Sequence, residues 1–158
     1  MAHPNDELIE RFYTAFDGHD GDTMAASYTP EARFSDPVFP DLRGREPGAM
    51  WRMLTGRSAD LRVELAEHEA DDTKGSAHWI ARYTYEGRPV VNDIRATFRF
   101  EDGKIAEHDD VFSFPRWARQ ALGPAGLLLG WTPLLRSAVR KKARAGLDEF
   151  LAADSAAV

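Results

Sequence analysis

The sequence predicts an α+β protein in which a curved antiparallel sheet wraps over N-terminal helices and a helical extension follows. Three observations carry this prediction. Apolar residues recur at helical spacing in the first third of the chain, and strand-like runs separated by short glycine-containing links fill the middle. A helical pattern then returns from residue 132. Helices followed by an antiparallel meander are typical of the α+β class.

The N-terminal part is expected to contain three helices and one short strand. Leu8, Phe12 and Phe16 recur at helical spacing, with Asn5 as a candidate cap, and Pro47 suits the first turn of the third helix. The expected elements are helices at residues 5–20, 20–29 and 44–57 and a strand at residues 32–36.

Four strand-like runs follow, and the links between them have the composition of hairpin turns. The links DDTKG, EGRP and EDGK are short and polar, and each contains a glycine. Consecutive strands are therefore expected to pair antiparallel. The runs cover residues 61–70, 76–87, 89–100 and 104–114.

Composition and charge limit the possible functions. The 158 residues are 43% hydrophobic and 29% charged, the balance of a globular protein that buries a substantial core. The absence of cysteine excludes a disulfide framework and a thiolate metal site. Residues 1–114 carry 13 basic and 23 acidic side chains, which argues against a nucleic-acid partner, whereas residues 115–158 carry 7 and 3. The N-terminus lacks the basic start and apolar run of a leader, so we expect a cytoplasmic protein.

Asp36 poses the main functional question, because it stands in the apolar stretch EARFSDPVF, residues 31–39. Phe34, Val38 and Phe39 favour a buried position, whereas a carboxylate normally avoids one. Either the chain makes a surface turn here, with the carboxylate bonded to the backbone, or the fold contains a cavity that holds an acid.

Several stretches resemble the nuclear transport factor 2-like superfamily, namely ERFYTAFDGHDGDTMAASYTPEARFSDP, LRGRE, and YEGRPVVNDIRATFRF followed by DGKI. Within it, they are most similar to the ketosteroid isomerase and SnoaL-like polyketide cyclase branch, over residues 5–114. The resemblance implies a cystatin-like α+β cone whose bent sheet and helices enclose a deep apolar pocket. Members include isomerases, cyclases, dehydratases, epoxide hydrolases and non-catalytic adaptors, so function must be argued from the pocket.

The same resemblance implies a role for Asp36. In ketosteroid isomerases the general base is the Asp of a strand-ending xDP motif after the second helix, and Asp36 falls on that motif. A carboxylate in an apolar pocket has a raised pKa and is a better base for proton abstraction next to a carbonyl. The two oxyanion donors of that family correspond to Phe12 and Ala96, which cannot donate, so we expect no ketosteroid isomerase activity. Tyr13 lies about 100° further round the helix and is expected to be a poor substitute.

The period of two in strands predicts which side chains face the interior. If Ala96 points inward, its strand also turns Asn92 inward, and the last strand turns His108 and Asp110 inward together. A His and an Asp on one strand face suit a base with an orienting carboxylate. The expected catalytic residues are Asp36, His108 and Asp110, and the expected ligand-binding residues are Phe12, Phe16, Trp51, Trp79, Tyr83, Asn92, Ile94, Ala96 and Phe112.

Each assignment has a structural alternative. His108 and Asp110 stand near a strand end and can lie at a wet rim, and Trp79 can be a core residue rather than a ligand contact. Asn92 suits either a hydrogen-bond anchor or a turn. No spacing motif supports a metal held by the histidine and the carboxylates, so we expect neither a metal nor a cofactor.

Two classes of function remain for the small apolar molecule that such a pocket would hold. The first is a cofactor-independent acid/base enzyme of the isomerase, cyclase, dehydratase or epoxide-hydrolase type. The second is a non-catalytic module that binds a ligand or a protein. The missing oxyanion donors favour the module, whereas inward ionisable groups favour the enzyme, since burying charge without use is costly. We favour the enzyme.

The outer face of the sheet is expected to form a homodimer interface. It would mix apolar and charged side chains in the proportion that suits an interface between copies. The side chains expected on it are His78, Ile80, Arg82, Thr84, Arg95 and Thr97.

The chain is expected to consist of a cone domain, residues 1–114, and a helical extension packed on it, residues 115–158. Thr132 and Pro133 can start a helix whose apolar stripe is Leu135, Val139, Ala143, Leu147 and Phe150, with basic residues off the stripe. We expect this stripe to pack on the acidic body, and we expect the flexible GLLLGW segment before it to close the mouth of the cone or that of a dimer partner. The less favoured alternative is a basic amphipathic helix, residues 132–151, that lies on an anionic membrane.

Overall fold

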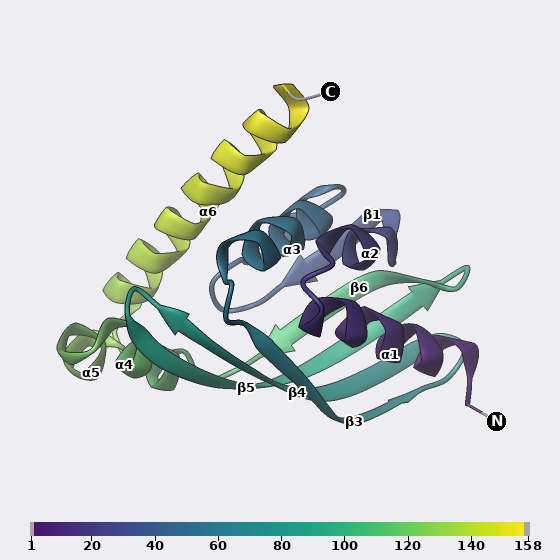
Figure 1. Cartoon of the computed structure of the whole chain (residues 1–158), viewed down its shortest axis with the longest axis horizontal. Coiled ribbons are helices and arrows are strands. Elements are labelled where there is room, and N and C mark those ends of the chain that lie inside the picture. The colour runs from purple at the N-terminus through teal and green to yellow at the C-terminus, as the bar shows by residue number, and fades with distance from the viewer. Residues whose placement is uncertain (1, 157–158) are drawn as a thin grey trace.

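The computed structural model describes residues 2–156 and confirms the α+β class (Figure 1). One curved six-stranded sheet carries helices on its concave side, with further helices at the C-terminal end. The helices are α1 (Pro4–Asp17), α2 (Gly21–Ala26), α3 (Glu46–Arg57), α4 (Phe114–Leu122), α5 (Pro124–Leu129) and α6 (Pro133–Ala156). The strands are β1 (Tyr28–Ser35), β2 (Leu42–Arg43), β3 (Arg62–Ala70), β4 (Lys74–Tyr85), β5 (Arg88–Glu101) and β6 (Lys104–Val111).

The sheet has the strand order β2-β1-β6-β5-β4-β3. As the turn chemistry predicts, β3 to β6 form an antiparallel meander, and Gly87 and Gly103 take the positive φ values that their tight turns require. The sheet is not wholly antiparallel, however, because β1 pairs with β6 in parallel. No hairpin joins these two strands, so no turn sequence could have indicated their direction.

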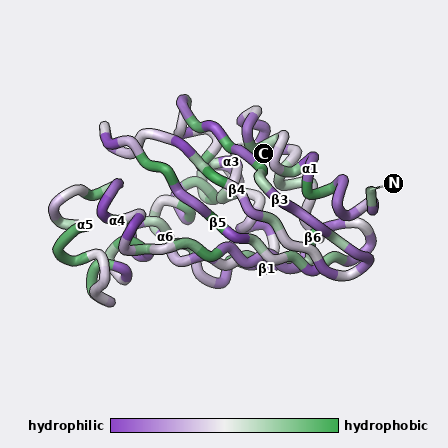
Figure 2. Tube along the Cα trace, turned by 90° about the horizontal axis from the view of Figure 1, so that it is seen from below, coloured by the Kyte–Doolittle hydropathy of each residue, from purple (hydrophilic) through white to green (hydrophobic). Residues whose placement is uncertain are grey.

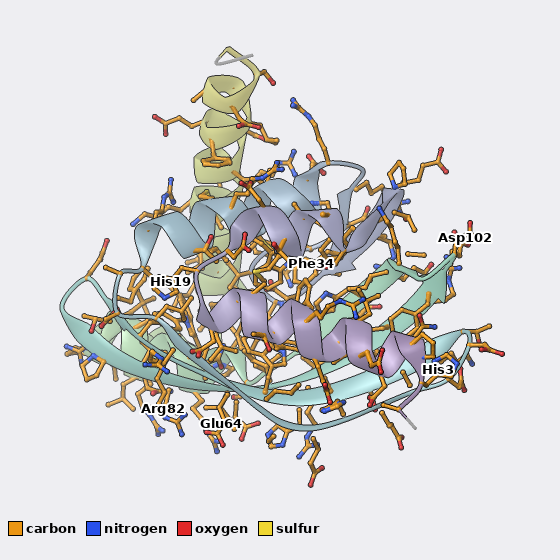
Figure 3. All side chains as sticks on the ribbon, turned by 45° about the vertical axis from the view of Figure 1, so that its right-hand side comes forward. His3, His19, Phe34, Glu64, Arg82 and Asp102 are labelled. Atoms are coloured by element: carbon orange, nitrogen blue, oxygen red, sulfur yellow. The ribbon has the colours of Figure 1, made fainter. Side chains whose placement is uncertain are left out.

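The helices bury their apolar faces against the concave side of the sheet. The stripe expected on α1 is buried, with Ile9 and Phe12 fully enclosed, and α1 lies across β3 and β4. Figure 3 shows Phe34 of β1 pointing into the space between the helices and the sheet. One core therefore joins the helices to the inner face.

Burial alternates along the strands as the period of two predicts. On β5, Val90, Asn92, Ile94, Ala96 and Phe98 are buried, while the residues between them are exposed. The buried positions of β4 include Ala77, Trp79 and Ala81, and those of β6 include His108 and Asp110. Glu64 and Arg82 lie on the opposite, outer face, where they form an ion pair (Figure 3). The inward sets are thus those read from the sequence.

The C-terminal region differs from the expectation in how it covers the cone. Helix α4, which was not predicted, brings Phe114 and Trp117 into a second apolar cluster that shares Val38, Tyr83 and Phe112 with the cone. GLLLGW does not close the mouth of its own cone, because Leu127, Leu128 and Trp131 are exposed, and closure of a dimer partner's mouth stays a prediction. The segment also forms helix α5 rather than an irregular flap.

Helix α6 packs on the body through the apolar stripe read from the sequence. Leu147 and Leu151 are buried in the main core, where Ala143 and Phe150 join them, and Leu135 and Val139 pack on the second cluster. The Arg144 guanidinium donates to the Glu46 carboxylate and ties α6 to α3. No helix within residues 2–156 combines the length and apolar character needed to cross a membrane.

Candidate active site

Asp36 follows the last residue of β1, and its carboxylate organises the turn after the strand. Its Oδ1 accepts the backbone N–H groups of Val38 at 2.7 Å and Phe39 at 2.6 Å. The Asp36 N–H in turn donates to the Phe39 carbonyl at 3.1 Å. The turn alternative for this residue is therefore realised through Oδ1, and the second carboxylate oxygen takes part in neither of these bonds.

The environment of Asp36 favours the neutral form of its carboxyl. Desolvation raises its pKa from 3.8 to about 6, and the Asp110 charge acts in the same direction. The backbone donors of Phe39 and Val38 oppose that rise. Asp36 remains partly accessible to solvent. A carboxyl that titrates close to neutral pH can accept and return a proton under ordinary conditions.

The parallel register of β1 and β6 brings Asp36 to Asp110. Phe34 lies opposite His108 and Ser35 opposite Asp109, so the next residue of each chain, Asp36 and Asp110, follows at the same level. Paired strands stand about 4.8 Å apart, and the two carboxyl groups are near enough for the Asp110 charge to raise the pKa of Asp36. Neither strand alone contains this pair, and only their pairing creates it.

A buried chain of hydrogen bonds holds Asp110. The Trp51 Nε1–H donates to the Tyr28 hydroxyl at 2.8 Å, and that hydroxyl lies 2.8 Å from His108 Nδ1. His108 Nε2 lies 2.9 Å from Asp110 Oδ1. The Tyr28 oxygen accepts the Trp51 indole N–H, so the Tyr28 hydroxyl can donate its own proton to His108 Nδ1. A neutral His108 then carries its proton on Nε2 and donates it to Asp110. Each donor in this chain then has an acceptor, as a buried polar network requires.

His108 is enclosed by aromatic rings and has no route to a ligand. Its side chain is 0% exposed, and its ring centroid lies 4.4 Å from that of Phe98, 4.9 Å from Phe34 and 5.8 Å from Phe12. Both ring nitrogens are engaged. In this geometry His108 orients Asp110, which reverses the order expected from the sequence, where the carboxylate would orient the histidine.

Two buried donors lack a hydrogen-bond partner within residues 2–156. They are the Tyr13 hydroxyl and the Trp79 Nε1–H, whose rings lie 5.5 Å apart. Burial raises the pKa of Tyr13 well above its usual range, and the nearby Asp110 charge raises it further. Buried donors normally have a hydrogen-bond acceptor. The two unpaired donors near the Asp110 carboxylate therefore mark a place where a ligand oxygen or a water can bind.

Tyr13 is the residue that sequence reasoning rejected, and the structure places it inside. Phe12 faces β6, where it packs on His108, while Tyr13 faces β4, where it packs on Trp79. Because the curved sheet wraps round α1, side chains about 100° apart on the helix both meet it. The burial of Leu8, Ile9, Phe12 and Tyr13 in succession shows how wide the covered arc is. The adjacent apolar residues on this helix were the feature of the sequence that could have indicated the inward position of Tyr13.

Tyr83 forms the border between the cone and α4. Its hydroxyl accepts the Trp117 Nε1–H at 2.8 Å, so the hydroxyl proton stays available to a ligand. Burial raises the pKa of Tyr83 to about 12, and the Asp36 charge contributes to that rise. Tyr83, Val38 and Phe112 are all partly buried and pack against the second apolar cluster, and the pKa effect places Tyr83 near Asp36.

The remaining residues expected to bind a ligand are buried on the inner side. Ile94 and Ala96 lie on β5 together with Asn92, which is 8% exposed. Phe16 and Trp51 pack on Trp79, with ring centroids 5.3 Å and 6.5 Å away. The structure therefore brings these side chains into one interior, and their contact with a ligand stays a prediction.

A separate group, Asp6, Glu10 and His68, has its ligand atoms close enough together to hold a metal ion. His68 Nδ1 lies 2.6 Å from Asp6 and Nε2 lies 3.4 Å from Glu10, so the imidazole already bridges the two carboxylates. It joins α1, which carries Asp6 and Glu10, to β3, which carries His68. This geometry is that of an ion-pair cluster between two elements.

Comparison with solved structures places the fold among known ones. The chain is similar to a putative polyketide cyclase from Xanthomonas campestris pv. campestris, with 22% identity, a TM-score of 0.65, and coverage of 75% of this chain and 96% of that chain. It is similar to an LEH-like epoxide hydrolase from Mycobacterium tuberculosis, with 22% identity, a TM-score of 0.63, and coverage of 84% and 95%.

A third similar structure is a protein with a ketosteroid isomerase-like fold from Catenulispora acidiphila, in complex with trimethylamine. It shows 17% identity and a TM-score of 0.66, with 80% of this chain and 98% of that chain covered. At these identities the similarity establishes the fold alone. A search of curated proteins finds no match.

The family description of the SnoaL-like domain matches residues 9–108, which span α1 to most of β6 and include Tyr13, Asp36 and His108. This match covers more than half of the chain and agrees with the cone architecture and its neighbours. The chain belongs to the SnoaL-like domain family of the nuclear transport factor 2-like superfamily.

Proposed function

We propose that the protein is a cofactor-independent acid/base enzyme that abstracts a proton next to the carbonyl of a small, mostly apolar molecule. One observation carries the proposal: a carboxyl with a pKa of about 6, Asp36, lies at the edge of an apolar interior that also contains two unpaired donors. Perturbed carboxyls and orphaned donors are costly to keep in a fold, and they gather at sites that use them. The structures similar to this chain include a putative polyketide cyclase and an LEH-like epoxide hydrolase, so an enzyme that acts on small molecules is compatible with this fold.

Each residue has a role that follows from its surroundings. Asp36 would accept the proton through the oxygen that the turn leaves over, because Oδ1 is already bonded to two backbone N–H groups. Tyr13 and Trp79 would donate to the oxygen that becomes negative as the enolate forms, an interaction that strengthens in the transition state. Asp36 would then return the proton to another carbon of the same molecule, so that no external reagent is consumed.

Asp110 and His108 would act as a pair with distinct tasks. The Asp110 charge helps to raise the pKa of Asp36, which makes Asp36 a stronger base. His108 is a positioning residue, since it is fully buried and holds Asp110 through Nε2. A role of His108 as the base itself would require the ring to leave the Tyr28 hydroxyl.

Hydrogen exchange at carbon tests the proposal whatever product the enzyme forms. The protein is incubated in D2O with a panel of small apolar ketones, enones and 1,3-diketones, and loss of α-proton signals is followed by NMR. We expect catalysed exchange for a subset of the panel, abolished in Asp36→Asn and reduced about 100-fold or more in Tyr13→Phe. Ligand binding without exchange, seen as chemical-shift changes in the protein alone, would favour the non-catalytic module.

We also expect no appreciable isomerisation of a 5-ene-3-ketosteroid. The positions that supply both oxyanion donors in ketosteroid isomerases hold Phe12 and Ala96, and each missing donor costs roughly 100- to 1000-fold in rate. The assay is the absorbance of the conjugated enone, with heat-treated protein as the blank. Steroid turnover that disappears in Tyr13→Phe would contradict this prediction and show that Tyr13 replaces the missing donor.

We infer that the chain forms a homodimer through the outer face of the sheet. Its side chains combine exposed Val91 and Val111 with ion pairs such as His78–Asp93 at 2.7 Å and Arg82–Glu64 at 3.0 Å. Apolar positions surrounded by organised charges suit a self-complementary interface. Light scattering at micromolar concentration should give twice the chain mass, reduced in Ile80→Glu, whereas a monomer mass would contradict the inference.

A further inference from the structure

The largest exposed hydrophobic side chains gather where α5 meets α6. We call Leu127, Leu128, Leu129, Trp131 and Leu134 the apolar tip; their exposed fractions are 61%, 70%, 49%, 75% and 81%. Figure 2 shows α5 as a hydrophobic segment at one end of the molecule, away from α1. Single exposed leucines need no explanation, but a contiguous group of this size marks an interaction surface.

The apolar tip is held by close packing rather than hanging loose. A Cβ at Gly126 would lie 1.8 Å from the Ala118 carbonyl oxygen, so only glycine allows α5 to lie so close to α4. Helix α4 is itself fixed to β5, because the Gln120 side chain accepts from the Val91 N–H at 2.8 Å and donates to its carbonyl at 3.1 Å. The fold therefore presents these leucines outward on a braced support.

Arginines border the apolar tip on two sides. A surface hollow of about 290 Å3 brings Arg116 and Arg119 together with Leu127 and Trp131. A second hollow, of about 390 Å3, joins Trp131 to Arg136 and Arg140. We call these four arginines the arginine rim. Trp131 thus stands between two pairs of cations.

The charge of this end is opposite to that of the rest of the chain. Residues 113–147 contain seven Lys and Arg and no Asp or Glu, whereas the remainder contains 13 basic and 26 acidic side chains. The net charge of -6 therefore hides a local positive field around the apolar tip. A partner that covers this end must accept leucines and a tryptophan and must supply negative charge.

We propose that the apolar tip and the arginine rim dock the protein on an anionic lipid bilayer. Leucines can enter the acyl boundary, Trp131 suits the interfacial layer, and arginines pair with anionic headgroups while their stems stay on apolar surface. A protein partner fits less well, because a stable protein interface needs about 800 Å2 and 20–30 residues a side, far more than five side chains on a tip offer. The sequence suggested that the apolar stripe of α6 could bind the membrane, but this stripe packs on the body of the protein. The surface proposed to bind the membrane is instead the corner between α5 and α6.

Fluorescence of the full-length protein with vesicles tests this docking. Trp51, Trp79 and Trp117 are at most 7% exposed, so Trp131, at 75%, should account for most of a blue shift on insertion. We expect binding and a blue shift with mixed phosphatidylcholine–phosphatidylglycerol vesicles and little of either with phosphatidylcholine alone. Trp131→Phe should keep the sedimentation with vesicles and lose most of the blue shift.

Paired variants separate the two contributions. Leu128→Ser/Leu134→Ser should weaken binding by about tenfold or more, and Arg116→Gln/Arg119→Gln by about 25-fold, at roughly a fivefold factor for each cation. The matched control for charge is Arg11→Gln/Lys104→Gln, two exposed cations distant in sequence from the apolar tip, and it should not change binding. Arg140 is left intact because it donates to the Pro37 carbonyl beside Asp36.

Three results would overturn the proposal. The first is failure of the wild-type protein to sediment with anionic vesicles. The second is equal loss of binding in Arg11→Gln/Lys104→Gln, which would indicate a general effect of charge. The third is a drop in solution mass in Leu128→Ser/Leu134→Ser without vesicles, which would assign the apolar tip to contact with a second copy of the chain. None of these outcomes depends on the acid/base activity.

Discussion

Asp36→Asn is expected to abolish the catalysed α-proton exchange and, at the same time, to make the protein more stable above neutral pH. A general base contributes about 100- to 10,000-fold in rate, and an amide cannot accept the proton. The amide oxygen can still accept from Val38 and Phe39, so the turn is kept. Loss of activity would therefore report on the chemistry and not on misfolding.

The gain in stability follows from the direction of the pKa change. The folded-state pKa of Asp36, about 6, is higher than the unperturbed 3.8, so the folded protein holds the proton more tightly than the unfolded chain does. Wild-type stability should decrease as pH rises from about 4 to about 6, with the full cost present above that range. The neutral amide of the Asp36→Asn variant carries no such cost.

At pH 8 we expect the free energy of unfolding of Asp36→Asn to exceed that of the wild type by about 1–3 kcal/mol, measured by denaturant unfolding. Near pH 4 this difference should disappear. The control is Asp60→Asn, an exposed carboxylate whose pKa is lowered by the Thr84 hydroxyl and should give no gain at pH 8. In the wild type, the exchange rate should fall as pH drops through about 6, because the base becomes protonated. A stability difference independent of pH would refute the raised pKa.

His108→Phe is expected to cost about 3–5 kcal/mol of stability although the ring volume is nearly unchanged. The variant removes the hydrogen bonds to Tyr28 and Asp110 at once and leaves a buried carboxylate without its partner. Chemical denaturation monitored by circular dichroism gives the free energy of unfolding. Tyr28→Phe is the matched control, since it keeps the ring and deletes one hydroxyl, and it should cost only about 1–2 kcal/mol.

A double variant tests whether the loss of stability in His108→Phe comes from the broken His108–Asp110 contact. His108→Phe/Asp110→Asn should be more stable than the sum of the single variants implies, by about 1 kcal/mol or more, because the amide tolerates burial better than the carboxylate. Strict additivity would mean that the His108–Asp110 contact contributes little. The same proteins show whether His108 positions Asp110, because the pH at which exchange is half-maximal should shift in His108→Phe if Asp110 moves away from Asp36.

Local patterns in the sequence determined most of the secondary structure and the inner faces of the strands. The alternation along β5 and the hairpin links between β3 and β6 depend on neighbours within a few residues, so they can be read directly. The same period placed His108 and Asp110 on one wall, and the SDP motif singled out Asp36. Family membership followed from these stretches and is confirmed.

Tertiary structure alone decided how these residues meet. The parallel pairing of β1 with β6, distant along the chain, sets Asp36 beside Asp110, and no turn sequence encodes that register. The curvature of the sheet turns Tyr13 inward as well as Phe12, because both sides of α1 are covered. The exposure of the apolar tip likewise depends on α4 having already closed the end of the cone with Phe114 and Trp117. Apolar composition indicates that burial of a segment is favourable. Whether the segment is buried depends on which surfaces remain available after the rest of the chain has packed, and only the tertiary structure shows this.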